Sequence, residues 1–299
     1  MMRKIARPRG RYHGVMPAPA LAPADRARGA LLGLAAGRAR AAVAAGGAPP
    51  DQPGGEPLLA ALLGEALLQP QPDFERLMTA WAAEARRQPT ALGAWTREAL
   101  GFFDAYHAPP PPEVVDGRAD AALLPRLVPV ALRFAGSPRH LLSATWHAAL
   151  LTHADPVAAW GAAAVNVAVA RFVAGWRDFV LDVIEALRNN ESPLPLLDAL
   201  RRLPLVRAGE VDAAVRGLPA AGATAVRALW LAYHEPRPDH ALDAAAGDAD
   251  LAMTVGALVG ARNGDAALPV EWRAVIPAAD GLAEMAELLL EASGVAPGA

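Results

Sequence analysis

Cysteine is absent from the 299-residue chain, and Lys4 is its only lysine. The lack of cysteine excludes disulfide bridges, thiolate metal sites and a cysteine nucleophile. Aromatic residues make up only 5% of the chain, and alanine and leucine dominate its hydrophobic majority. This balance favours helix and disfavours sheet. The net charge of −3 leaves no domain-wide basic field, so we expect no nucleic-acid partner.

Long uninterrupted apolar runs are also missing, because Arg, Asp, Glu or Pro breaks each apolar segment. A bilayer span needs about 20 consecutive apolar residues, so we expect no membrane segment and a cytoplasmic location. The basic first eleven residues lead into a Pro/Ala-rich run, not into the apolar core of a signal peptide. The sequence therefore predicts a disordered tail over residues 1–22 and one compact all-α domain over residues 23–299.

Apolar residues recur at helical spacing, and no period-2 strand pattern stands out. Asp73 and Asp155 mark helix starts, and Thr90 is a third predicted N-cap. Pro125 and Pro129 predict a kink or break in the segment that contains them. The predicted helices span residues 24–45, 56–68, 73–87, 91–107, 119–134, 138–151, 156–175, 178–188, 195–202, 210–217, 224–234, 247–261, 269–276 and 281–293.

Two carboxylates, Asp248 and Asp250, stand directly before the uncharged run 251–261. Gly256 and Gly260 lie four residues apart in that run, so its helix is predicted to pack backbone-close against a neighbour. The acids have two interpretations. They can cap the helix and complement its dipole, or they can supply oxygens to a hard cation or to a ribose.

Other chemistry-bearing patterns are few. The chain has no G-x-S-x-G elbow, no P-loop or dinucleotide-type glycine loop, and no H-E-x-x-H pair. His140 and His147 share a helix face, and we expect them to be packed or surface residues, not ligands. His153 follows the same predicted helix, whose C-terminal dipole favours a partly protonated imidazole.

Five short segments stand in collinear order: RARGALLGLAAG (26–37), ALGAWTREAL (91–100), LLTHADPVAAWGAAA (150–164), GDADLAMTVGALVGA (247–261) and ALPVEW (267–272). Together they resemble the ADP-ribosylglycohydrolase family, the relatives of dinitrogenase-reductase-activating glycohydrolase. The resemblance implies an all-α fold and two Mg²⁺ ions held by carboxylates and hydroxyls. It also implies hydrolysis of the bond between ADP-ribose and a protein side chain or similar acceptor.

The first motifs depart from the family pattern. Where the family usually has an aspartate after the first helix's glycine, this chain has Arg38. The family's Thr-Asp-Asp-Thr cluster falls on residues 54–57, so that Glu56 is the one carboxylate left there. By the resemblance, most metal ligands of the second helix are missing.

The later motifs are degraded less. The family's Asn-Gly pair falls on two alanines, with Asp120 beside them. Asp248 and Asp250 match the last motif, but the threonine that follows is Leu251. The helix beyond is one residue short, so the register of the two acids stays open.

Mg²⁺ demands near-octahedral oxygen coordination, and the remaining acids are too few to hold two ions. We therefore expect no metal ion and no cofactor, although the family would use Mg²⁺. Arg38 offers a hypothetical replacement, since its charge would substitute for a cation if it paired with Asp248 or Asp250. No catalytic residue is assigned, and the candidate ligand-binding residues are Asp248, Asp250, Glu56, Asp120, Arg38 and His153.

Three functions remain open. The first is a catalytically degenerate family member that keeps the fold and a cleft for ADP-ribose, a related nucleotide or an ADP-ribosylated protein. The second is a working hydrolase with a rebuilt, metal-poor carboxylate site, since paired carboxylates can cleave glycosidic bonds without metal. The third is a structural or partner-binding helical protein without a ligand cleft.

Overall fold

The computed structural model describes residues 21–111 and 120–295, and this part of the chain contains helices and no strand. The all-α prediction is confirmed, whereas the predicted tail over residues 1–22 lies almost wholly outside the described residues. The α-helices are α1 (Pro23–Ala44), α2 (Gly55–Leu67), α3 (Phe74–Arg87), α4 (Ala94–Tyr106), α5 (Leu123–Arg126), α6 (Val128–Arg133), α7 (Pro138–Leu150), α8 (Pro156–Val173), α9 (Val180–Arg188), α10 (Leu194–Arg202), α11 (Val211–Ala214), α12 (Ala220–His234), α13 (Pro238–Ala245), α14 (Ala249–Asn263), α15 (Val270–Arg273) and α16 (Ala279–Ala292). Short 3₁₀ turns are η1 (Pro89–Ala91), η3 (Ala208–Glu210) and η4 (Asp265–Ala267).

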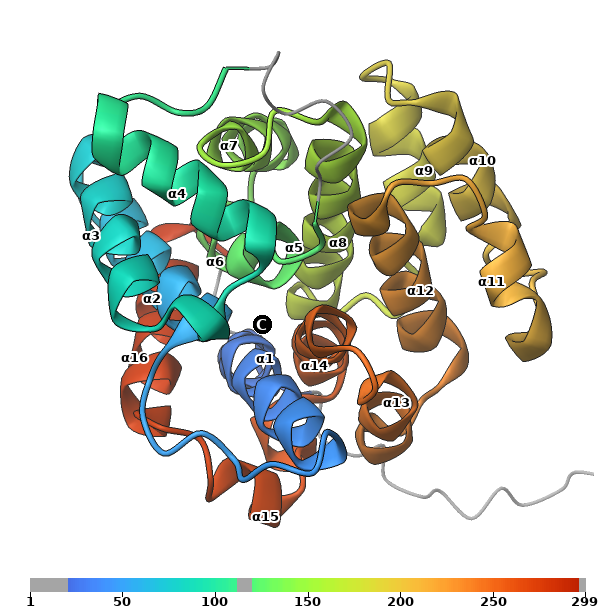
Figure 1. Cartoon of the computed structure of the whole chain (residues 1–299). Coiled ribbons are helices and arrows are strands. Elements are labelled where there is room, and N and C mark those ends of the chain that lie inside the picture. Colours follow the sequence, from blue (N-terminus) through green and yellow to red (C-terminus); the bar gives the residue numbers. More distant parts are fainter. Residues whose placement is uncertain (1–20, 112–119, 296–299) are drawn as a thin grey trace, which may run out of the picture.

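Helices α1 and α14 lie side by side at the centre of the molecule (Figure 1). Glycines spaced four residues apart meet across this contact, with Gly33 against Gly256 and Gly29 against Gly260. A Cβ on Gly33 would lie 2.8 Å from the Gly256 carbonyl carbon, closer than real side chains pack. The two backbones therefore touch directly, because neither glycine has a side chain to hold them apart. The close packing predicted from Gly256 and Gly260 is confirmed.

The other helices surround this pair. Helix α8 packs against α1, α7, α12 and α14, while α2 packs against α3, α5 and α6. Helices α3 and α4 form one flank of the molecule, α9 to α11 form the opposite flank, and α16 lies near α2 (Figure 1). The core is built mainly from alanine, leucine and valine side chains, as the composition suggests.

Helix α8 is long and apolar enough to cross a membrane, which the prediction of no such segment did not anticipate. Among the described residues it is the one helix with that property, and 78% of its most apolar window is buried inside the protein. The core helices of globular domains have the same composition, because they are apolar all round.

Most predicted helix starts are confirmed. The Asp73 carboxylate accepts the Arg76 N–H at 2.9 Å, and the Asp155 carboxylate accepts the Ala158 N–H at 2.7 Å. The predicted break falls between α5 and α6. The predicted cap at Thr90 is wrong, because the chain first forms η1 and buries Leu92 before α4 begins.

Two predicted helices are much shorter than expected. The segment predicted over residues 210–217 is helical as α11 only to Ala214, and Gly217 then adopts a left-handed φ of 86°. The segment predicted over 269–276 is helical as α15 only to Arg273. Pro277 disfavours helical geometry only in Ile276, so it does not explain why α15 already ends at Arg273.

Candidate functional site

The start of α2 carries Glu56 into the protein interior. Gly55 has a left-handed φ of 59°, and its N–H donates to Glu84 Oε1 at 3.2 Å. A Cβ on Gly54 would lie 2.9 Å from the Gln88 amide carbon, so this tight entry suits glycine at both positions. The Glu56 side chain that follows is only 2% exposed.

Arg126, at the end of α5, is a second buried charge. Its Nε lies 2.8 Å from Glu56 Oε2 in an oblique ion pair that leaves neither Glu56 oxygen with an aligned hydrogen bond. Its terminal nitrogens donate to the hydroxyls of Thr96, at 2.9 Å, and Thr152, at 3.3 Å. The guanidinium also lies 5.2 Å from the centroid of a Trp81 ring, within cation–π range. These contacts compensate the guanidinium for its lost hydration.

Hydrogen bonds continue from Thr152 through His153 to Asp120. The Thr152 hydroxyl is 2.9 Å from His153 Nδ1, and His153 Nε2 is 3.0 Å from Asp120 Oδ1. An ionised aspartate only accepts, so the proton sits on Nε2 and the hydroxyl donates to Nδ1. Asp120 also accepts the backbone N–H groups of Thr96, at 3.3 Å, and Ala122, at 3.2 Å. The carboxylate is thus fixed in orientation while 23% of its side-chain surface stays exposed.

The two acids of α14 have different roles. Asp248 is exposed and accepts the Leu251 N–H at 3.1 Å, so the capping interpretation is confirmed for it. Asp250 is half-buried, and it is close enough to Asp120 for that charge to act on it. The Thr254 hydroxyl donates to the Asp250 backbone carbonyl at 2.7 Å and so serves the helix.

Burial acts on all three acids, Glu56, Asp120 and Asp250, and their charges repel one another. Burial raises the pKa of Glu56 to about 8 against the attraction of Arg126, and repulsion from Asp250 and Asp120 adds to the rise. Burial, with repulsion from Asp120 and Asp248, raises the pKa of Asp250 to about 7. Burial acts the same way on Asp120, but the hydrogen bond from His153 and the charge of Arg126 outweigh it and lower the pKa of Asp120. Asp120 keeps its charge, and the other two acids take up protons near neutral pH.

Of the three histidines between residues 140 and 153, one is buried and two are exposed. Burial lowers the pKa of His153 despite its hydrogen bond to Asp120, and the charge of Arg126 lowers it further. The prediction of a partly protonated imidazole there is wrong, because full burial beside a guanidinium outweighs the helix dipole. His140 and His147 lie exposed on α7, as predicted.

Arg38 does not pair with Asp248 or Asp250, contrary to the sequence-based hypothesis. Its guanidinium donates to the Gly54 carbonyl, and no carboxylate of the described residues lies within ion-pair distance of it. Pairing with Asp248 or Asp250 is not observed. Glu56, Asp120 and Asp250 form a carboxylate cluster, and the guanidinium within it belongs to Arg126 instead.

Sequence reasoning missed Arg126 and the two threonine hydroxyls that accept from it, those of Thr96 and Thr152. One signal was present, since Arg126 is the only charged residue in the apolar run 121–132. Arginine is almost never fully buried without a partner, so a lone charge in such a run indicates an interior ion pair.

The donor set does not fit two Mg²⁺ ions. Residues 54, 55 and 57 contribute no side-chain oxygen, the Glu56 carboxylate faces Arg126, and the Asp248 carboxylate caps its own helix. In the described part of the chain no group of three or more His, Asp or Glu side chains is arranged to hold a metal ion. Octahedral coordination of two hard cations needs more oxygens than this cluster offers.

The described part of the chain is all-α, with acids at the starts of α2 and α14. The ADP-ribosylglycohydrolase family model matches residues 19–298, so the chain belongs to this family. A solved structure titled "ADP-ribosylglycohydrolase-related protein complex" is similar to it at 25% identity, with a TM-score of 0.72 over 91% of this chain and 99% of that one. No curated protein matches the sequence significantly. The resemblance drawn from the five collinear segments is confirmed.

Proposed function

We propose that this chain is a non-hydrolysing member of the family, which binds ADP-ribose, or ADP-ribose attached to a protein, without divalent cations. The observation that carries the proposal is the buried Glu56–Arg126 ion pair. A guanidinium within the carboxylate cluster supplies the positive charge that bound cations would otherwise bring. It pairs with Glu56, the one acid at the start of the second helix.

The acids that stay accessible suit a sugar ligand. Asp120 is partly exposed and held by His153 and two backbone N–H groups, and Asp250 is half-buried beside it. Carboxylate oxygens accept hydrogen bonds from ribose hydroxyls, and an acceptor fixed in orientation loses little entropy on binding. Asp120 and Asp250 are therefore the proposed ribose-contacting residues.

Calorimetric titration with ADP-ribose tests this proposal. Binding should be the same with Mg²⁺ and with EDTA. Asp250→Asn should weaken it about tenfold, because one carboxylate oxygen that accepts from the ribose is replaced by an amide NH₂ group. Asp212→Asn is the matched control, since Asp212 lies on α11 with its side chain 85% exposed. Binding that requires Mg²⁺ would refute the proposal, and the absence of any binding would favour a structural or partner-binding role.

One observation favours a second function, a metal-free hydrolase. Asp250 is half-buried and near enough to the partly exposed Asp120 for their charges to interact, and its pKa of about 7 lies near the operating pH that general acid–base catalysis requires. This alternative predicts release of ADP-ribose from an ADP-ribosylated peptide in EDTA, with loss of turnover in Asp250→Asn. Turnover that EDTA abolishes would instead show that the count of metal ligands is wrong.

A further inference from the structure

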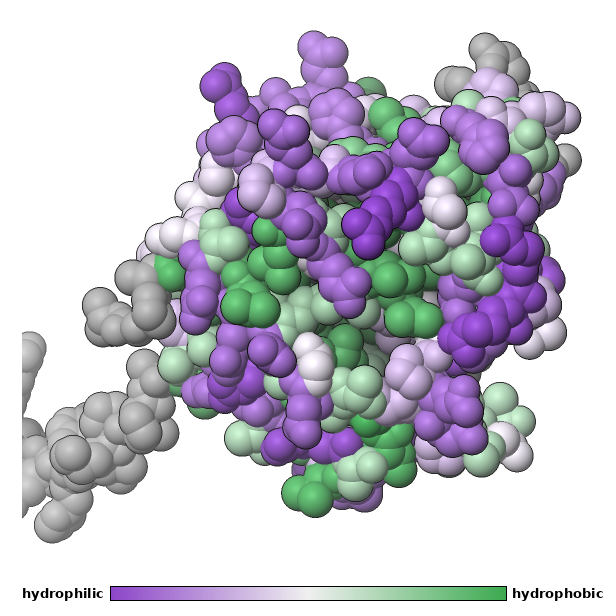
Figure 2. Space-filling model, turned by 90° about the vertical axis from the view of Figure 1, so that its left-hand side faces the viewer, coloured by the Kyte–Doolittle hydropathy of each residue, from purple (hydrophilic) through white to green (hydrophobic). Residues whose placement is uncertain are grey.

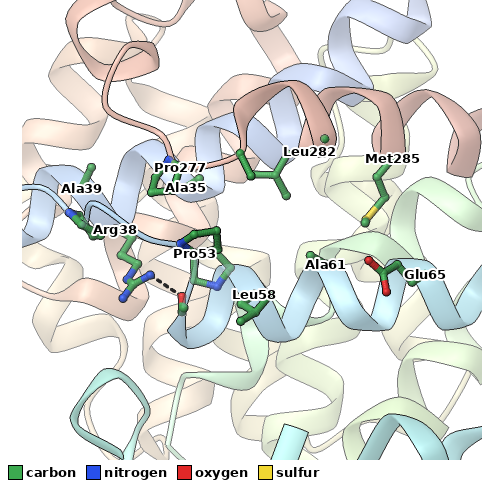
Figure 3. A pocket seen from close by; sticks show the side chains of 15 residues that line it. Ala35, Arg38, Ala39, Pro53, Leu58, Ala61, Glu65, Pro277, Leu282 and Met285 are labelled. Atoms are coloured by element: carbon green, nitrogen blue, oxygen red, sulfur yellow. Dashed lines mark hydrogen bonds between the residues drawn. The ribbon is translucent and has the colours of Figure 1, made fainter. Parts of the chain in front are cut away.

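The side of the molecule that carries α2, α3 and α16 gathers apolar surface near its centre, among hydrophilic side chains (Figure 2). Between α1, α2 and the start of α16 lies a pocket of about 230 Å³ (Figure 3). Leu58 and Ala61 of α2 lie opposite Leu282 and Met285 of α16 across it. The walls are thus mainly aliphatic.

The pocket is distinct from the carboxylate cluster. Leu58, Ala61 and Glu65 follow one face of α2 and line the pocket. Glu56 and Leu59 lie on another face and are buried in the interior. None of the cluster's three acids lines the pocket, so α2 separates two different environments.

Polar groups occur at the two ends of the pocket. Arg38 lies at one end and Glu65 at the other (Figure 3). Glu65 is exposed to solvent, whereas Arg38 is half-buried. The charges of Glu84 and Glu56 act on Arg38 from a distance, but no carboxylate of the described residues lies within ion-pair distance of it. Its one hydrogen bond, to the Gly54 carbonyl, leaves further N–H groups without a charged acceptor. A partly desolvated guanidinium favours an anion that can accept from them.

We propose that this pocket binds a small carboxylic acid with an apolar body, its carboxylate on Arg38 and its hydrocarbon against Leu58, Leu282 and Met285. An engineered cavity of ~150 Å³ accepts benzene. A pocket of about 230 Å³ therefore has room for one aromatic ring or a chain of six to eight carbons together with a carboxylate. Burial of the hydrocarbon and the charge-assisted hydrogen bond would act together.

Calorimetry with octanoate, 1-octanol and inorganic phosphate tests the proposal on the full-length protein. Octanoate should bind with a dissociation constant of roughly 0.1–1 mM, the range that fits a ligand of ten heavy atoms. Octanol should bind at least tenfold more weakly, and phosphate should not displace octanoate. Arg38→Gln should bring octanoate down to the affinity of octanol.

A variant that fills the pocket tests the proposal without any change to Arg38. Gly281 lines the pocket, and a Cβ placed on it meets nothing within 4 Å, so Gly281→Leu should fill the space without a clash. Gly101→Leu is the matched control, because Gly101 is an equally open helical glycine outside the pocket, on α4. Gly281→Leu should abolish octanoate binding, and Gly101→Leu should preserve it.

Four results would overturn the proposal. They are no octanoate binding up to 10 mM, equal affinity for octanoate and octanol, displacement of octanoate by phosphate, and unchanged octanoate binding in Gly281→Leu. Absence of octanoate binding would mean that the pocket is unused. Equal affinity for octanol would mean that the carboxylate is not recognised, and displacement by phosphate would mean that the hydrocarbon is not. Unchanged binding in Gly281→Leu would mean that octanoate binds elsewhere.

Discussion

Replacing Gly33 with alanine should destabilise the protein strongly, although alanine is the better helix former. The new Cβ would lie 2.8 Å from the Gly256 carbonyl carbon, and its nearest neighbour is the carbonyl oxygen of the same residue. Ordinary contact begins at 3.4 Å, so the backbones of α1 and α14 would have to separate by at least 0.6 Å at this point. Neither backbone has a flexible side chain there that could move aside.

The magnitude follows from two opposed effects. Overpacking a close contact costs about 1–3 kcal/mol and occasionally more. The gain in helix propensity from glycine to alanine is about 1 kcal/mol. Because the contact is backbone against backbone, we expect the upper end of the penalty and a net loss of about 2 kcal/mol. Separation of α1 from α14 would also shift Asp250, which lies in the first turn of α14.

The assay is urea unfolding followed by circular dichroism, with Gly101→Ala as the control. Gly101 is an exposed glycine in α4 with open space around it, so this variant should gain about 0.5–1 kcal/mol. The two variants should therefore differ by about 3 kcal/mol in free energy of unfolding. If Gly33→Ala unfolds within 0.5 kcal/mol of Gly101→Ala, the backbone contact is not as tight as described.

The buried ion pair leads to two further predictions. The folded-state pKa of Glu56 is raised from 4.5 to about 8, so its protonated form stabilises the fold fully below pH 4.5, and this contribution is lost as the pH rises through 8. The free energy of unfolding should therefore fall more steeply between pH 5 and 8 in the wild type than in Glu56→Gln. Urea titrations of both proteins at both pH values would measure the two slopes. Equal slopes would contradict the argument that burial raises the pKa of Glu56. Arg126→Met should cost about 3–5 kcal/mol at pH 9, where Glu56 is ionised, because it leaves the Glu56 carboxylate buried without its cation. The double variant Glu56→Gln/Arg126→Met should recover part of that loss, and strict additivity of the two changes would show that the residues do not interact.

Local features of the fold were predictable from the sequence. Asp73, Asp155 and Asp248 cap helices because each needs only a backbone N–H three residues further on. Gly256 and Gly260 predicted a close helix contact. Their partners on α1, Gly33 and Gly29, could not be deduced, because helix pairing depends on the tertiary arrangement. The Thr90 prediction failed for the same kind of reason, because burial of Leu92 decides where α4 begins.

The site was predictable only in part. The family resemblance singled out Glu56 and Asp120, and His153 was a candidate from its place at a helix end; their side chains contact Arg126 or each other. It did not identify Arg126, because the family pattern names the acids that are missing and not the base that neutralises the charge of the acids that remain. Nor could the sequence show where Arg38 points, since a guanidinium on a flexible stem can reach several acceptors near its helix.

Titration with Mn²⁺, followed by the electron paramagnetic resonance signal of the free ion, tests the central claim most directly. Mn²⁺ accepts the same oxygen ligands as Mg²⁺ and can be counted in solution. If Arg126 and protons neutralise the carboxylate cluster, the wild-type protein at pH 7 should bind no stoichiometric Mn²⁺ at concentrations up to 1 mM. Two tightly bound ions per chain, lost in Glu56→Gln or Asp250→Asn, would contradict the account.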